Sequence, residues 1–187
     1  MLSDKIISGI IAIGSLFYSA IPGVNAEFLP IEFFPKGGAL VINTQLDNCF
    51  SPELEEIILT GHPIRFHYTV QVLESGTDKV VVENSFYHEI RYYLLDKVYT
   101  VQTSENQKIL ETESFLRAQE YVTNLLAINA VTSDDIQFDK KYYVKIFAYL
   151  DKIFLPNLDK EIDLMFYWNK NKPEISSSFF NRSLITQ

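Results

Sequence analysis

The chain has 187 residues, of which 47% are hydrophobic and 14% are aromatic, and this composition is typical of one globular domain with a sizeable core. Its formal net charge is −8, whereas a surface that binds nucleic acid is basic. Length, composition and charge therefore favour a folded domain and exclude nucleic acid as the expected partner.

The first 26 residues have the layout of a secretory signal peptide. Lys5 precedes the apolar run IISGIIAIGSLFYSAI, and Val24–Ala26 supplies a small-x-Ala cleavage site. The apolar run is shorter than the roughly 20 residues that span a bilayer as a helix. We therefore expect an exported, periplasmic protein that is cleaved after Ala26 and keeps no stable transmembrane span. The alternative is an uncleaved segment that anchors the chain to the inner membrane.

The predicted domain follows a short lead-in. Residues 27–36 contain two prolines and are interpreted as an irregular lead-in or an edge strand. After a glycine turn, residues 39–47 alternate as a half-buried strand does, and one side of that strand carries Leu40, Ile42, Thr44 and Leu46. We expect a single β-rich domain over residues 37–181 and a frayed tail over residues 182–187.

A short helix is predicted over residues 52–60. Ser51 is a suitable N-cap, Pro52 suits the first helical position, and Gly61 is a natural stop. The spacing i, i+3, i+4 gives the helix one apolar stripe, made of Leu54, Ile57 and Ile58. A helix of this length is not stable alone, so we expect the stripe to pack on a sheet.

A long hairpin over residues 63–103 organises the rest of the chain. Its first limb alternates from Ile64 to Val72, and its second limb turns again at Asp96-Lys97 and continues as VYTVQT. Matching apolar residues across the hairpin predicts the pairs Ile64–Ile90, Tyr68–Phe86 and Val72–Val82. A slip of one residue would invert the faces, and the turn residues alone leave both registers open.

Further elements follow the hairpin. A second helix is predicted over residues 114–128, with a stripe of Phe115, Ala118, Val122, Leu125 and Leu126. Residues 129–141 are interpreted as a loop with a short strand at Ala130–Val131. Strands are predicted over residues 142–154, 160–168 and 174–180, separated by a break at 155–157 and a turn at 169–173. The fold class is thus mainly β (α+β): an antiparallel β-sandwich or curved sheet of about seven to eight strands with two short helices packed on it.

The sequence contains no recognisable active site. The three histidines, His62, His67 and His88, lack metal-ligand spacing, and we interpret the two in the hairpin as half-exposed strand residues that approach each other in one register. The lone Cys49 excludes an intramolecular disulfide and is interpreted as a small buried hydrophobe. Other candidate groups are read as strand or solvated surface: Ser176–Ser178, Glu55-Glu56 and Asp134-Asp135. We therefore predict no catalytic, cofactor-binding or metal-binding residues.

Aromatic residues alternate on the second face of the predicted sheet. They are Tyr87, Tyr93, Tyr143, Phe147 and Tyr149. The favoured interpretation is that the two helices cover this face and make it core. The alternative is a groove for a peptide or an apolar ligand, in which aromatic side chains would anchor binding.

Several runs together resemble an uncharacterised bacterial family. The run from Phe50 to Phe66 is similar to its pattern L-S-x-E-L-x-E-A-L-x-x-G-(I/V)-P-L-x-F, and the stretch from Tyr92 to Tyr99 to its pattern Y-x-x-L-(S/T)-x-x-Y. The run from Tyr142 to Asp151, followed by Leu155-Pro156, resembles its Y-R-V-R-L-R-L-x-L-D…L-P strand. Residues 173–180 resemble its closing W-x-L-S-S-x-W-Y. The match runs in order over residues 37–181.

The family is a domain-of-unknown-function group of small exported proteobacterial proteins, often encoded near a two-component sensor kinase. This chain departs from it in two ways. The arginine-rich strand has Lys145, Phe147 and Tyr149, and the tryptophans are replaced by Pro173 and Phe179. The resemblance implies an envelope protein and supplies no catalytic residues.

Three functions follow as hypotheses. The first is a non-enzymatic periplasmic accessory or protein-binding domain with an envelope protein as partner. The second is a carrier of an apolar ligand or peptide in an aromatic-lined groove. The third is an enzyme of unknown type, for which perturbed titratable groups in a cleft would be the sign.

Overall fold

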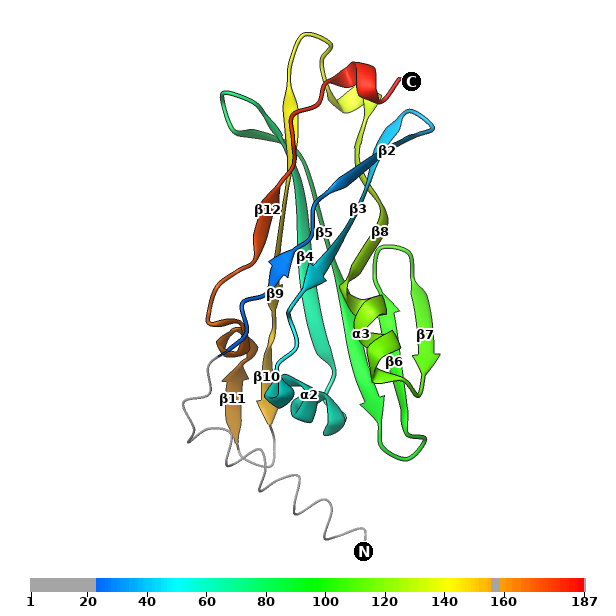
Figure 1. Ribbon diagram of the computed structural model, residues 1–187, viewed down its shortest axis with the longest axis vertical. Coiled ribbons are helices and arrows are strands. Elements are labelled where there is room, and N and C mark those ends of the chain that lie inside the picture. The colour runs from blue at the N-terminus through cyan, green and yellow to red at the C-terminus, as the bar shows by residue number, and fades with distance from the viewer. Residues whose placement is uncertain (1–22, 156–158, 187) are drawn as a thin grey trace, which may run out of the picture.

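The computed structural model describes residues 23–155 and 159–186 of the chain, with the side chain of residue 155 left aside. Most of the predicted signal peptide, residues 1–22, lies outside the described residues, as does most of the predicted break at 155–157. The described residues form two large antiparallel sheets, a separate two-stranded hairpin and two short α-helices, which Figure 1 labels. The prediction of a mainly β, antiparallel fold with two helices is confirmed.

The larger sheet has six strands in the order β12-β9-β4-β5-β6-β7. Their bounds are β4 Ile64–Glu74, β5 Lys79–Tyr93, β6 Val98–Thr103, β7 Lys108–Thr112, β9 Tyr142–Leu150 and β12 Glu174–Ser176. The hairpin has the predicted register, because Ile64 pairs with Ile90, Tyr68 with Phe86 and Val72 with Val82. A bulge follows Val72, so the pairing shifts only at the tip of the hairpin.

The smaller sheet has four strands around β3. They are β1 Glu27–Phe28, β2 Glu32–Lys36, β3 Ala39–Asp47 and β8 Asn124–Thr132. The strands β1 and β2 pair with one side of β3, and β8 pairs with the other side. The predicted lead-in is therefore edge strand, since residues 27–36 belong to this sheet. A separate hairpin joins β10 Lys152–Leu155 to β11 Lys160–Asp163.

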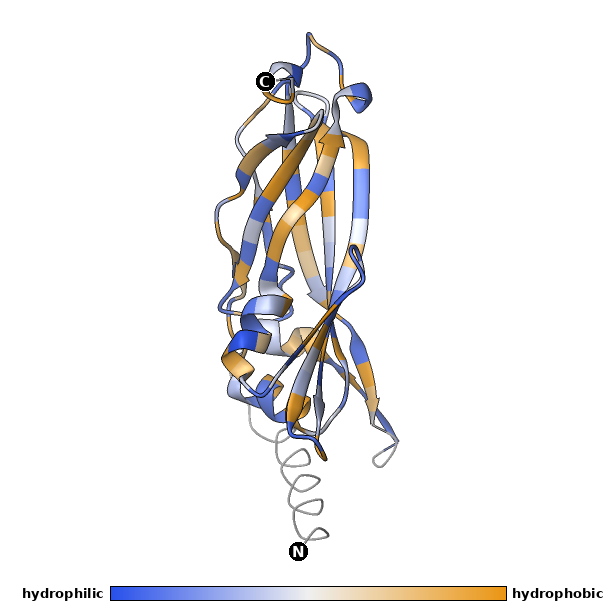
Figure 2. Ribbon diagram, turned by 90° about the vertical axis from the view of Figure 1, so that its right-hand side faces the viewer, coloured by the Kyte–Doolittle hydropathy of each residue, from blue (hydrophilic) through white to orange (hydrophobic). Residues whose placement is uncertain are grey.

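The core lies between the inner faces of the two sheets and under the two helices. Fully buried side chains include Leu40 and Ile42 from the smaller sheet and Tyr68, Val72 and Ile146 from the larger sheet. The helices α2 Pro52–Leu59 and α3 Phe115–Thr123 lie at the end of the larger sheet that the smaller sheet does not reach, as Figure 1 shows. Figure 2 shows the resulting alternation of apolar and polar residues along the strands.

The helix α2 agrees closely with the prediction. The Ser51 side chain accepts a hydrogen bond from the Leu54 N–H at 3.2 Å, and Pro52 occupies the first turn. The predicted stripe of Leu54, Ile57 and Ile58 is buried. The positive φ of Gly61, +88°, ends the helix in a conformation that favours glycine. Cys49, just before the helix, is 2% exposed, as predicted for a small hydrophobe.

The prediction of a helix over residues 114–128 is wrong after Thr123. The chain changes there from helix to the strand β8, so Leu126 is exposed. The short strand predicted at Ala130–Val131 is part of β8, which is longer than predicted and takes in residues 124–132. The carbonyl of Val122, in the last helical turn, accepts hydrogen bonds from Tyr68 Oη at 2.9 Å and from His88 Nδ1 at 2.8 Å. These two core side chains replace the N–H groups that a longer helix would have supplied.

Three further predictions in the C-terminal part need correction. The predicted strand 160–168 ends at Asp163, and Leu164–Trp168 form a 3₁₀ helix, η3, capped by the Asp163 side chain. The predicted last strand, 174–180, is only the three residues of β12. The predicted frayed tail forms a 3₁₀ turn, η4 Arg182–Leu184, and buries Ile185.

Candidate binding groove

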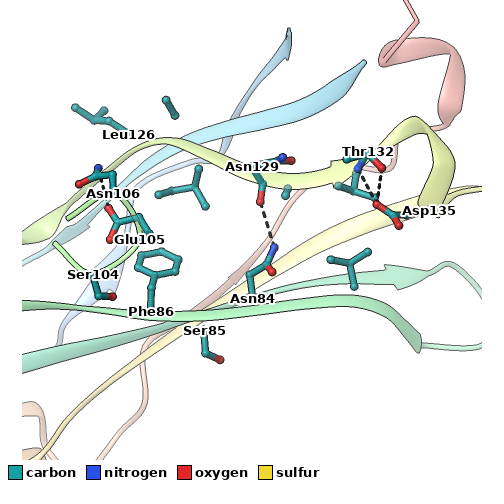
Figure 3. Close-up of a pocket in the computed structure, with 15 residues that line it drawn as sticks. Asn84, Ser85, Phe86, Ser104, Glu105, Asn106, Leu126, Asn129, Thr132 and Asp135 are labelled. Atoms are coloured by element: carbon teal, nitrogen blue, oxygen red, sulfur yellow. Dashed lines mark hydrogen bonds between the residues drawn. The ribbon is translucent and has the colours of Figure 1, made fainter. Parts of the chain in front are cut away.

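An open groove of about 600 Å³ lies between the two sheets, where β5 faces β8. Its walls are residues of β5, the turn after β6 and the strand β8, and one end reaches the 3₁₀ turn η1 Ser133–Asp135. The lining includes the apolar side chains of Val82, Phe86 and Ile128. Figure 3 shows the polar ends, with Glu105 and Asn106 at one and Thr132 and Asp135 at the other.

The groove exists because β5 is much longer than its neighbour β6. β5 has 15 residues, whereas β6 has 6 and pairs only with residues 88–93 of β5. After Thr103 the chain turns away into β7. The position that a longer β6 would occupy beside β5 is thus open, and this position forms the groove.

The free edge of β5 presents backbone groups to the groove. Backbone groups point alternately to the two sides of a strand, and the Tyr87 carbonyl accepts a hydrogen bond from the Ser104 N–H on the β6 side. The N–H and C=O of Ser85, two residues earlier, point to the same side. Among the described residues, no strand pairs with Ser85 there.

β8 forms the opposite wall with its own free edge. It pairs with β3 only, and no ladder joins it to β5 in the described part of the chain. One side-chain hydrogen bond crosses the groove in the described part of the chain: Asn84 Nδ2 donates to the Asn129 carbonyl at 3.2 Å, as Figure 3 shows. Two unpaired strand edges therefore face each other, joined by a single amide bridge among the described residues.

The carboxylate at one end of the groove, Glu105, is in contact with a buried histidine. His88 is 1% exposed, its Nδ1 donates to the Val122 carbonyl, and its Nε2 lies 3.2 Å from Glu105 Oε1. Burial alone would raise the pKa of Glu105, but the hydrogen bond and the charge of His88, with a smaller contribution from Lys108, bring that pKa below its ordinary value of 4.5. Glu105 is therefore anionic at neutral pH.

The lowered pKa of Glu105 predicts a defined effect of pH on stability. A carboxylate whose pKa is lower in the folded state stabilises the fold above its unfolded pKa, and this contribution disappears as the pH falls through the folded pKa. We expect Glu105→Gln to lower the free energy of unfolding at pH 7 by at most about 1 kcal/mol, because the groove end is open to solvent and salt. Denaturant titrations of both proteins should converge once the pH has fallen below the lowered pKa of Glu105 in the folded state. A difference that stays constant from neutral to acid pH would contradict the lowered pKa of Glu105.

The three histidines considered as metal ligands lie apart from each other. His67 and His88 are on opposite faces of the larger sheet, because His67 pairs with Tyr87 and His88 pairs with Phe66. His88 is buried, not half-exposed as predicted, since α3 and the 105–106 turn cover it. His62 Nδ1 lies 2.8 Å from Thr60 Oγ1 in the turn after α2. No group of three or more metal-ligating side chains comes together in the part of the chain that the structure describes.

The other candidate groups serve the fold. The Asp135 carboxylate accepts hydrogen bonds from the Thr132 N–H at 3.1 Å and from Thr132 Oγ1 at 2.7 Å, which caps η1. Ser177 Oγ accepts from the Val144 N–H at 2.9 Å and holds the segment after β12 against β9. Glu55 and Glu56 lie on α2, away from its buried stripe.

The favoured interpretation of the alternating aromatic residues is wrong. The helices cover the inner face of the larger sheet, whereas these residues lie on its outer face, where Tyr93 is exposed and the others are half-buried. Tyr149 stacks on His67 with ring centroids 4.6 Å apart, and Arg65 lies over Tyr87. His67 Nε2 is 2.8 Å from Asp151 Oδ2 but outside hydrogen-bond geometry. On this outer face the aromatic rings stack on neighbouring side chains. The groove lies on the opposite, inner face of the larger sheet.

The fold is a two-sheet α+β domain, and its candidate site is a groove at a gap in strand pairing. Residues 25–169 match the family described as Domain of unknown function (DUF4390), and the chain belongs to this family. No curated protein and no solved structure is significantly similar to it. Within the described residues, no helix is both long and apolar enough to cross a bilayer.

Proposed function

We propose that this chain is a non-enzymatic accessory domain of the bacterial envelope that binds a protein partner through the groove between β5 and β8. The observation that carries the proposal is the pair of free strand edges facing each other across about 600 Å³. Unpaired strand edges are templates for another strand, and proteins normally cover or blunt them. An edge that lines an open groove is suited to binding a polypeptide.

The groove suits a polypeptide better than the alternatives. An apolar carrier buries its ligand among hydrophobic side chains, but this groove is open, has Phe86 as its one aromatic lining residue, and ends in polar groups. Catalysis requires titratable groups brought together in a cleft. Burial raises the pKa of both Cys49 and Tyr68, yet neither side chain lines the groove.

The binding test uses two tryptophan substitutions at adjacent positions of β5. Asn84 points into the groove, whereas Glu83 lies on the outer face, where its carboxylate accepts a hydrogen bond from Gln71. We expect peptides selected on the wild-type protein from a phage-displayed random octapeptide library to bind Asn84→Trp at least about tenfold more weakly, a loss of about 1.4 kcal/mol. Fluorescence anisotropy with synthetic copies of those peptides measures the change.

Glu83→Trp is the matched control, because it adds the same ring to the same strand on the opposite face. It should change affinity less than about twofold. Circular dichroism melting of both variants checks that the fold is intact. If no peptide is enriched, or if both variants bind equally well, the groove is not a polypeptide site and the proposal fails.

We also propose export to the periplasm, supported by the layout of residues 1–26. Near the predicted cleavage site, the Val24 N–H donates to the Tyr167 carbonyl at 2.9 Å and Asn169 Nδ2 donates to the Gly23 carbonyl at 2.9 Å. Cleavage after Ala26 would remove these contacts, and retention of the segment as an anchor would keep them.

Processing is tested by the intact mass of protein recovered from the envelope of the native host. We expect a chain that begins at Glu27, because the small-x-Ala site precedes it. A full-length mass found in the membrane fraction would establish the anchored alternative.

A further inference from the structure

The charged side chains that line the groove are all acidic. Glu105 stands at one end and Asp135 at the other, and no lysine or arginine is among the residues that line it. Glu105 is held by a buried histidine, and Asp135 by the backbone and hydroxyl of Thr132. Both carboxylates are thus fixed in position before any partner arrives, and a basic side chain is the group that complements them.

The free edge of β5 determines how an occupant would bind. The Ser85 N–H and C=O face the groove without a strand partner, and they continue the line of backbone groups that pair with β6 from residue 88 onward. A segment laid along this line would extend the larger sheet beside β5, collinear with β6. The stretch of β8 that lines the groove has seven residues. From the first to the last there are six steps of about 3.3 Å, or about 20 Å in all, which accommodates an extended segment of about six or seven residues.

We propose that the occupant of the groove is an extended, basic polypeptide segment that adds as a strand to β5 at Ser85 and places a lysine or arginine at a carboxylate end of the groove. This inference rests on the proposed function, and it adds the mode of binding and the charge of the partner. Backbone hydrogen bonds to β5 supply affinity, and Glu105 and Asp135 supply selectivity for basic side chains.

The composition of the selected octapeptides tests the charge. We expect lysine and arginine to be enriched over glutamate and aspartate on the wild-type protein, and replacement of the basic residues by glutamine to weaken a selected peptide at least about fivefold. In the double variant Glu105→Gln, Asp135→Asn, the lysine and glutamine peptides should bind within about twofold of each other. Both substitutions keep side-chain size and polarity, so the groove keeps its shape.

Amide hydrogen exchange tests the mode of binding. The Ser85 N–H should exchange more slowly in the peptide complex, because it gains a backbone partner. The Glu89 N–H lies on the same side of β5 within the stretch that already pairs with β6, so its protection should change less.

The outcomes separate this inference from the proposed function. Peptides that need the groove but show no basic preference, or that leave Ser85 unprotected, would overturn the inference and leave the protein-binding function standing. Peptides unaffected by Asn84→Trp would overturn both. Light scattering that shows a dimer in the wild type and a monomer in Asn84→Trp would identify a second copy of this chain as the occupant and overturn the basic-segment proposal.

Discussion

Replacing Trp168 by alanine should lower the free energy of unfolding by about 3–5 kcal/mol, the cost of removing a large aromatic side chain from a core. Trp168 is fully buried at the end of η3, and its ring packs 5.8 Å from Phe66 between centroids. Its Nε1–H donates to the Cys49 carbonyl at 2.8 Å. The substitution therefore leaves a cavity and an unpaired buried carbonyl, and each is destabilising. Urea titration followed by circular dichroism measures the change.

Phe166 provides the matched control on the same 3₁₀ helix. Its side chain is 46% exposed, so Phe166→Ala removes an aromatic ring without opening a cavity in the core. We expect a cost below about 1 kcal/mol, in the range of surface substitutions. Equal losses from the two substitutions would show that η3 itself, and not the buried Trp168 ring, fixes the C-terminal segment to α2.

The hairpin was predictable because two independent patterns agree in it. Apolar alternation assigned the inward face from Ile64 to Val72, and matching apolar residues across the strands gave the register, including Tyr68 opposite Phe86. The helix α2 was equally predictable, because the N-cap Ser51, the following Pro52 and the apolar stripe all indicate a helix over residues 52–60, close to the observed Pro52–Leu59. The sequence alone predicts an element correctly where several local signals, such as capping residues and apolar periodicity, favour the same structure.

The end of α3 was not predictable from local pattern. Leu125 continues the spacing of Ala118 and Val122, so a helical stripe extends past Thr123 in the sequence. The structure ends the helix there because Tyr68 and His88, distant in the chain, occupy the Val122 carbonyl, and because Ala127 takes a positive φ of 57°. Tertiary contacts decided between helix and strand, as they often override propensity.

The face assignment of the aromatic residues failed for a related reason. Alternation tells which residues share a face of a sheet but not which face the helices cover.

The groove was missed as well, since the position of β8 next to β5 depends on how the two sheets pack. One signal was present: the second limb of the hairpin is far longer than the VYTVQT strand that follows it. Such a mismatch leaves part of the longer strand without a partner.

The helix α2 offers a second test of large effect, because its order depends on packing. Ile58 is fully buried, in a stripe with Leu54 and Ile57, and a helix of eight residues is marginal without tertiary contacts. We expect Ile58→Ala to lower the free energy of unfolding by about 2–5 kcal/mol. That is a large part of a typical total of about 5–15 kcal/mol. Trp168 is the only tryptophan in the chain, so its fluorescence reports the transition in a urea titration.

Glu56→Ala is the control on the exposed side of the same helix, two residues from Ile58. Because it removes no buried contact, it should change the free energy of unfolding by less than about 0.5 kcal/mol. The contrast between the two substitutions measures how firmly the stripe is packed against the sheet. If Ile58→Ala were as harmless as Glu56→Ala, the stripe would not be buried in the monomer in solution. The surface of α2 would then replace the groove between β5 and β8 as the proposed docking site for a protein partner.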